Sequence, residues 1–140
     1  DLDTQTNSLI SEHGDYFMET LLASSTPVIE QNVGKKLFPT YSFFRIYDKG
    51  STLPIHTDRG SCEYTVAVCL GCDPQDSYEI FIGSEDDKSD YKGMDKIHWR
   101  EYCKHDHFMT VFLHYVDQNG KYAEHKFDKR DMLGGQSVKI

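Results

Sequence analysis

The apolar residues follow a helical spacing near the N-terminus and a strand-like alternation over most of the remaining chain. The partly helical spacing predicts a helix over residues 15–24. Thr26 and Pro27 match an N-cap followed by proline at the first helical position, and Gly34 suits a C-cap, so we expect a second short helix there. Further on, β-prone residues alternate with polar ones, which predicts strands over 41–48, 53–58, 62–70, 78–82, 107–116 and 121–127.

The order of these elements predicts a single mainly β (α+β) domain over residues 1–140. In this interpretation residues 1–36 form a helical buttress, residues 37–129 form the β core, and residues 130–140 form a tail. Asn119 and Gly120 lie between the last two expected strands, and Asn-Gly is a strong signal for a hairpin. Helices followed by many short antiparallel strands favour a jelly roll.

Composition and charge narrow the class of partner. The chain has 140 residues, of which 38% are apolar and 27% are charged, which suffices for one domain with its own core. Its formal charge of −8 argues against nonspecific nucleic-acid binding, which requires clustered lysine and arginine. No stretch approaches the roughly 20 apolar residues of a membrane span, so we expect no membrane partner. The acidic run over residues 83–91 predicts a solvated loop that acts as a mobile lid.

The cysteines raise the question of a structural metal. Cys69 and Cys72 have the spacing of a zinc-binding pair. Cys62 and Cys103 are far apart in the sequence, so neither supplies the second close pair that a structural zinc site needs. We therefore expect Cys62 and Cys69 to be ordinary strand residues, and the compartment to be reducing and cytoplasmic.

The most informative feature is the tripeptide His56-Thr57-Asp58, which is followed later in the chain by His98. Two imidazoles and one carboxylate are the ligands of a 2-His-1-carboxylate facial triad. Such a triad holds Fe(II) on one face and leaves the opposite coordination positions open for a cosubstrate and O2. His56 and Asp58 are two residues apart, so their side chains point to the same side of an extended strand. The pattern therefore predicts an iron site that supports oxidative chemistry.

These residues belong to a longer pattern that resembles the prolyl-hydroxylase-like branch of the 2-oxoglutarate and Fe(II)-dependent dioxygenases. The similarity covers roughly residues 37–129 and is more specific than any of its single motifs. It runs through Tyr47-x-x-Gly50-x-x-x-x-x-His56-x-Asp58, residues 62–70, His98-Trp99-Arg100-Glu101 and residues 111–117. The interval between Asp58 and His98 is short for the family, which implies trimmed central strands or loops.

The resemblance implies a double-stranded β-helix, which is a jelly roll with the metal inside one mouth. His56, Asp58 and His98 would bind Fe(II) and form the catalytic centre. The implied cofactors are Fe(II) and 2-oxoglutarate, with ascorbate as an accessory. The implied reaction is hydroxylation of a C–H bond by O2, with decarboxylation of 2-oxoglutarate to succinate and CO2.

The distal carboxylate of 2-oxoglutarate has to be met by a cation and usually by a hydroxyl group. Tyr47 falls where similar proteins place a tyrosine that hydrogen-bonds this carboxylate. The arginine or lysine that the family carries shortly after the distal histidine is missing from residues 105–110. The residues that we predict in its place, or as further lining of the cosubstrate pocket, are Arg45, Arg59, Arg100 and Thr110. His114 shares a strand face with Thr110 and is expected to line the same pocket.

The resemblance makes a peptidyl prolyl or a related amino-acid residue the leading substrate, and a small molecule stays open beside a polypeptide. Two other functions remain. One is a metal-binding β-barrel without oxygenase turnover, which the missing arginine favours. The other is a protein-interaction β domain in which His56 and Asp58 only make hydrogen bonds. His105 and His107 form a rival pair, but their surroundings are typical of an exposed loop and we expect no metal there.

Overall fold

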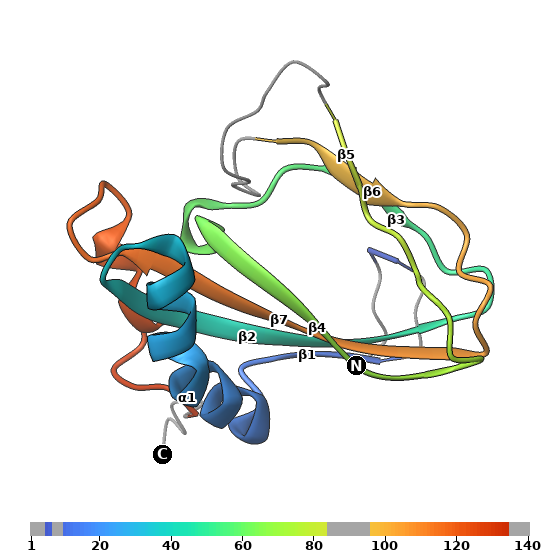
Figure 1. Ribbon diagram of the computed structural model, residues 1–140, viewed down its shortest axis with the longest axis horizontal. Coiled ribbons are helices and arrows are strands. Elements are labelled where there is room, and N and C mark those ends of the chain that lie inside the picture. The colour runs from blue at the N-terminus through green and yellow to red at the C-terminus, as the bar shows by residue number, and fades with distance from the viewer. Residues whose placement is uncertain (1–4, 7–9, 84–95, 135–140) are drawn as a thin grey trace.

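The protein consists of two antiparallel sheets that face each other, with one long helix outside them (Figure 1). The computed structural model describes residues 5–6, 10–83 and 96–134. The elements are β1 Ile10–His13, α1 Tyr16–Val33, β2 Leu37–Asp48, β3 Leu53–His56, β4 Tyr64–Asp73, β5 Phe81–Ile82, β6 His98–Arg100 and β7 His107–Asp117, with the 3-10 segments η1 Gly60–Cys62 and η2 Ala123–Lys129. Among the described residues, no helix has both the length and the apolar character needed to cross a membrane.

The larger sheet has the strand order β1-β2-β7-β4, and its centre is the long pairing of β2 with β7. Side chains alternate along β7, so Val111, Leu113 and Tyr115 point to one face while the residues between them point to the other. These three pack with Leu22 of α1 and with Leu37 into the main hydrophobic cluster. The helix therefore covers the outer face of this sheet and leaves its inner face to the interior.

Helix α1 is continuous from Tyr16 to Val33, so the predicted division into two short helices is wrong. Asp15 caps the N-terminus by accepting a hydrogen bond from the backbone N–H of Met18. Thr26 does not start a new helix, because its hydroxyl donates back to the carbonyl oxygen of Leu22. Pro27 is carried inside the helix, where packing against the sheet outweighs its unfavourable helix propensity. Gly34 ends the helix in the left-handed conformation, as predicted.

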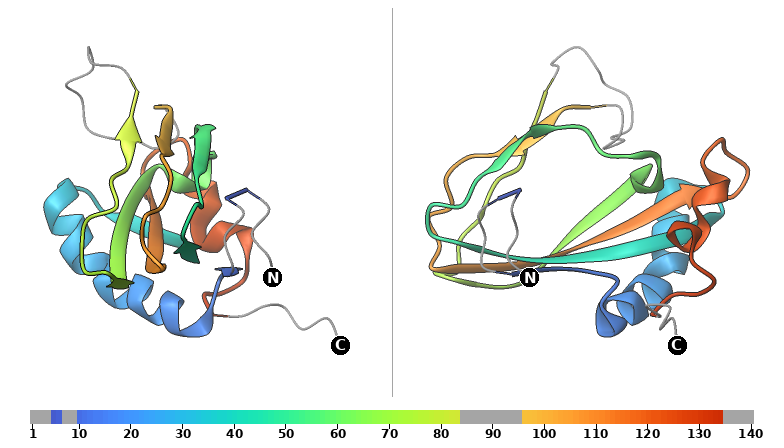
Figure 2. Two further views of the ribbon diagram at one scale, coloured as in Figure 1. Left: turned by 90° about the vertical axis from the view of Figure 1, so that its right-hand side faces the viewer. Right: turned by 180° about the vertical axis from the view of Figure 1, so that it is seen from behind.

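The smaller sheet has the order β3-β6-β5, and it lies opposite the inner face of the larger sheet (Figure 2). His56 of β3 and His98 of β6 are direct cross-strand partners. Opposite residues of an antiparallel pair point to the same face, so both imidazoles lie on one side of this sheet. The outer face of the sheet exposes Ile55 and Ile97.

Several segments differ from the prediction. Of the strands expected over 53–58 and 78–82, only Leu53–His56 and Phe81–Ile82 form. The strand expected over residues 121–127 is absent, and η2 occupies this region instead of a hairpin strand. Phe127, Asp128 and Lys129 have φ angles of 53°, 54° and 61°, and three consecutive left-handed residues are incompatible with a strand. Residues 1–36 are not purely helical, because β1 adds a strand to the edge of β2.

The described part of the tail is tied to the helix through a buried ion pair. Arg130 donates to the carboxylate of Glu19, which is 1% exposed, and the backbone N–H of Gly134 donates to the same carboxylate. Most of the acidic run that we predicted as a lid lies outside the described residues. The mainly β architecture is confirmed, and the complete double-stranded β-helix stays a prediction.

Candidate metal centre

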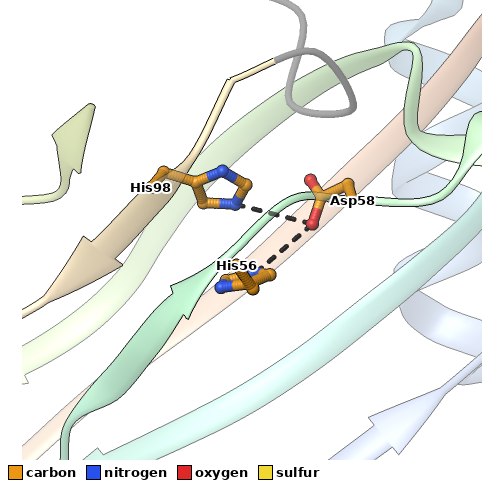
Figure 3. Close-up of side chains that lie close together, drawn as sticks. All are labelled: His56, Asp58 and His98. Atoms are coloured by element: carbon orange, nitrogen blue, oxygen red, sulfur yellow. Dashed lines mark ion pairs between the residues drawn. The ribbon is translucent and has the colours of Figure 1, made fainter. Parts of the chain in front are cut away.

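The structure brings the three predicted ligands together between the two sheets (Figure 3). One oxygen of Asp58 lies 3.4 Å from Nε2 of His56 and 3.5 Å from Nε2 of His98. One ligand atom from each residue lies within 4.8 Å of the other two, which is the spacing of donors that share an ion. Within the described ranges, this is the one such group of histidine, cysteine and acidic side chains.

The backbone orients both imidazoles for metal binding. Nδ1 of His56 contacts the carbonyl oxygen of Pro54 at 2.8 Å, and Nδ1 of His98 contacts the carbonyl oxygen of Lys96 at 3.0 Å. A carbonyl oxygen only accepts, so in each ring Nδ1 carries the hydrogen. In the neutral form Nε2 then holds a lone pair, and in both rings Nε2 is the atom turned toward Asp58. This donor set fits a divalent metal ion.

The electrostatics of the triad follow from its packing. Burial of Asp58 favours its neutral form, but hydrogen bonds from His56 and His98 outweigh burial and hold the pKa of its carboxyl well below the usual range. Burial also opposes the charged form of His98, yet its hydrogen bonds to Asp58 and to the Lys96 carbonyl raise its pKa above 6.5. Without metal, the site therefore favours protonated His98 paired with the Asp58 carboxylate. A bound metal cation would take the place of the proton between them.

The triad opens onto a cavity of about 550 Å³. One part of its wall is apolar and includes Phe43, Ile82 and Phe112, which come from both sheets. Such a cavity is large enough for a small organic ligand. The arrangement can therefore hold a metal ion together with a molecule beside it.

Arg45 is the buried cation of this cavity. Its side chain is 4% exposed, and its guanidinium donates to the hydroxyl of Tyr47 at 3.2 Å and to the side-chain oxygen of Gln5 at 2.8 Å. Arg45 and Tyr47 are two residues apart on β2, so both side chains point to the inner face. Arg45 thus borders the cavity, whereas Tyr47 is fully buried behind it and is not among the residues that line the cavity.

The other residues predicted to contact 2-oxoglutarate are paired with other groups or lie outside the cavity. Arg59 lines the cavity, but both of its terminal nitrogens donate to the carboxylate of Asp128, at 2.5 and 2.8 Å. Arg100 is buried among the rings of Tyr47, Tyr78 and Phe108, with its guanidinium carbon 4.7–5.4 Å from their centroids, and it does not border the cavity.

Thr110 does not line the cavity either, and its hydroxyl donates to the carbonyl oxygen of Val68. His105, which we expected on an exposed loop, is 3% exposed, because its ring packs against Tyr78 and Phe108. Its Nε2 contacts the carbonyl oxygen of Asp76.

Sequence reasoning missed part of the polar wall near the triad. Tyr41, Cys62 and Thr65 line the cavity together with His114, which we had expected there. The hydroxyl of Thr65 lies 3.3 Å from the carbonyl oxygen of Cys62 and 2.9 Å from Nδ1 of His114. Burial lowers the pKa of His114 to about 4, so its ring is neutral at neutral pH. Strand alternation alone could have placed Tyr41 and Thr65 on this face.

No family model matches the chain, and no curated protein is similar to it in sequence. Its fold is similar to the crystal structure of an oxidoreductase of the 2OG-Fe(II) oxygenase family from Burkholderia pseudomallei, with a TM-score of 0.58 and 16% sequence identity. The match covers 73% of this chain and 57% of that protein, so the chain spans little more than half of its structural neighbour. The mainly antiparallel β fold of this chain is therefore one that a 2OG-Fe(II) oxygenase shares.

Proposed function

We propose that the protein is an Fe(II)- and 2-oxoglutarate-dependent dioxygenase that hydroxylates a C–H bond. The observation that carries this proposal is the convergence of His56, Asp58 and His98 at a cavity that also contains the buried guanidinium of Arg45. A metal-binding triad and a deep cation are the two features that chelation and anchoring of a keto diacid require. The fold shared with a 2OG-Fe(II) oxygenase supports the same conclusion.

His56, Asp58 and His98 would hold Fe(II), each through one ligand atom. When bound, Fe(II) and 2-oxoglutarate would supply the activation of O2 and the oxidation of the substrate, with release of succinate and CO2. The chain itself orients the ligands through the carbonyl oxygens of Pro54 and Lys96, because these fix the hydrogen on Nδ1 and leave Nε2 as the nitrogen that would bind the metal. The apolar wall of the cavity would limit the access of water.

Arg45 is the proposed anchor of the distal carboxylate, with Tyr47 supporting it from behind. Arg45 borders the cavity, and its hydrogen bond to the Tyr47 hydroxyl would hold the guanidinium in place for a carboxylate. Arg59 suits this role less well, because its charge is already paired with the carboxylate of Asp128. Arg100 and Thr110 would support the site from behind, Arg100 through its stacking on Tyr47.

The proposed substrate is a peptidyl prolyl or a related amino-acid residue, and this narrower assignment is supported by the sequence motifs alone. The apolar wall formed by Phe43, Ile82 and Phe112 suits an aliphatic ring better than a strongly polar group. Incubation with proline-containing peptides, 2-oxoglutarate, ascorbate and O2 should add the mass of one oxygen atom to a peptide and form succinate in equal amount.

An anaerobic titration tests the proposal before any substrate is known. Protein loaded with Fe(II) should develop the weak visible charge-transfer band of a chelated keto acid when 2-oxoglutarate is added. Arg45→Gln should weaken 2-oxoglutarate binding at least about tenfold, since a charge-assisted pair is lost. Arg59→Gln is the matched control and should change it little. Iron binding without the band would contradict the oxygenase and favour the metal-binding β-barrel.

A further inference from the structure

A phenol and a thiol are in contact in the wall of the metal cavity. The hydroxyl oxygen of Tyr41 lies 3.1 Å from Sγ of Cys62, and both residues line the cavity. Tyr41 is 8% exposed and Cys62 is 2% exposed, so solvent does not supply alternative partners for this pair. A thiol is a weak hydrogen-bonding group, and a buried tyrosine hydroxyl usually has a stronger partner. We therefore considered whether the two groups react with each other.

The ring of Tyr41 is held on several sides. His13 stacks on it at 4.5 Å between centroids, His114 lies at 4.4 Å, and the guanidinium carbon of Arg59 lies 4.6 Å from its centroid. Cys62 is held on η1, the short 3-10 segment that follows the ligand Asp58. The Tyr41 ring cannot turn away without disturbing these contacts, so the phenol is held against the thiol in the wall of the cavity that the triad also lines.

We propose that Cys62 and Tyr41 become covalently joined by a thioether between Sγ and the ring carbon next to the hydroxyl-bearing carbon. The inference rests on the proposed Fe(II) site, which would activate the oxidant O2. The S–H bond of Cys62 and one ring C–H bond of Tyr41 break, and one C–S bond forms. Two electrons and two protons pass to O2, which is reduced to hydrogen peroxide, so atoms and electrons balance.

The geometry suits this bond because sulfur and oxygen on neighbouring ring carbons are separated by nearly the distance already present between Sγ and the Tyr41 oxygen. To form the bond, Sγ would move from its contact with the Tyr41 oxygen toward the neighbouring ring carbon, while the ring stays in place. Burial raises the pKa of the Cys62 thiol to about 12, so the group remains protonated at neutral pH. This thiol is not an ordinary reactive thiolate, and an oxidative route accounts for its reaction better than nucleophilic attack.

The cross-link would tie β2 to η1 through the cavity wall. Only Arg59 separates Asp58 from the start of η1, so the bond would limit the movement of this proposed ligand. The joined phenol would still present its oxygen to the cavity. The modification would therefore make the metal site more rigid and would permanently alter the wall that faces the substrate.

Peptide mass spectrometry tests the inference without any knowledge of the substrate. Protein loaded anaerobically with Fe(II), checked for bound iron and then exposed to O2, is denatured, reduced, alkylated and digested with trypsin. We expect residues 37–45 and 60–88 to be recovered as one linked species, lighter than their sum by two hydrogen atoms and resistant to reduction. The number of alkylated thiols should fall from four to three.

Three variants control this experiment. Tyr41→Phe retains the ring but lacks the phenol and should not cross-link. Cys69→Ser removes an exposed cysteine of the same tryptic peptide and should leave the link intact. Asp58→Ala should abolish it together with iron binding. If iron is bound and the two peptides stay separate after O2 exposure, the thioether is excluded while the proposed function stands. If iron does not bind, both fail.

Discussion

The two sheets differ in what covers them. The larger sheet, β1-β2-β7-β4, has long paired strands and buries its outer face under α1. The smaller sheet, β3-β6-β5, has strands of two to four residues and leaves Ile55 and Ile97 on its outer face 64% and 46% exposed. Yet the smaller sheet carries both histidines of the triad. The main hydrophobic cluster and the two histidines therefore lie in different layers, although Tyr41 and Arg45 of the cavity belong to β2 of the larger sheet.

The largest effect should come from the ion pair that fixes the tail to the larger sheet's helix. Glu19→Gln leaves the guanidinium of Arg130 without its carboxylate in a largely buried position. We expect a loss of about 3–5 kcal/mol in the free energy of unfolding, measured by urea denaturation. Glu124→Gln is the control, because this side chain is 70% exposed, and it should change stability by less than about 0.5 kcal/mol. Equal effects of the two variants would contradict a structural role for the pair.

The next effect should come from the hydrophobic cluster beneath α1. Leu113 is 2% exposed and points from β7 into this cluster, so Leu113→Ala creates a cavity. The expected loss is about 2–5 kcal/mol. Iron affinity of the folded variant should stay close to that of the unaltered chain, because the mutated face points away from the triad. A large drop in iron affinity at full folding would show that the two layers are coupled.

A smaller effect concerns pH at the triad. The pKa of His98 is raised above 6.5 by Asp58, so in the metal-free protein the contribution of this pair to stability is complete below 6.5 and is lost as pH rises through the raised pKa. The lowered pKa of Asp58 means that its contribution is lost as pH falls through that value.

Metal binding should have the opposite dependence on pH at His98. Iron needs the neutral imidazole, so its affinity should fall by up to about tenfold for each pH unit below the raised pKa. Calorimetric titration in buffers of different ionisation enthalpy should detect the released proton. Affinity that is independent of pH across this range would contradict His98 as a ligand.

The smallest effect should come from the outer face of the smaller sheet. Ile55 lies on β3 beside His56 but points away from the cavity and is largely exposed. Ile55→Ala should change the free energy of unfolding by no more than about 0.5 kcal/mol and should leave iron affinity unchanged. A loss comparable to that of Leu113→Ala would mean that this face is packed in solution, and the contrast between the sheets would no longer hold.

Local patterns predicted much of this fold and the three residues that meet at the candidate metal site. The spacing of His56 and Asp58 predicted that their side chains meet, although β3 ends at His56 and Asp58 lies just beyond it. Alternation located β2, β4 and β7 with boundary errors of a few residues. Helix α1 passed through Pro27 because tertiary packing overrode a local signal. The Asn119-Gly120 signal failed because the chain after it turns into η2, where Asp128 pairs with Arg59.

The rest of the candidate site depends on contacts between distant segments. The approach of Cys62 to Tyr41, the pairing of Arg59 with Asp128 and the burial of Arg100 among aromatic rings all join residues that no local period relates. Arg45 was predicted as one of several candidate anchors, and its position in the cavity separates it from Arg100 and Thr110.

Anaerobic calorimetric titration with Fe(II) is the most direct test of the metal centre. We expect one tightly bound Fe(II) per chain. Asp58→Ala and His98→Ala should weaken binding by at least about 100-fold, because each removes a ligand rather than a supporting group. His105→Ala should bind iron like the unaltered chain if it remains folded. If Asp58→Ala and His98→Ala bind Fe(II) as tightly as the unaltered chain, the triad is not the metal site.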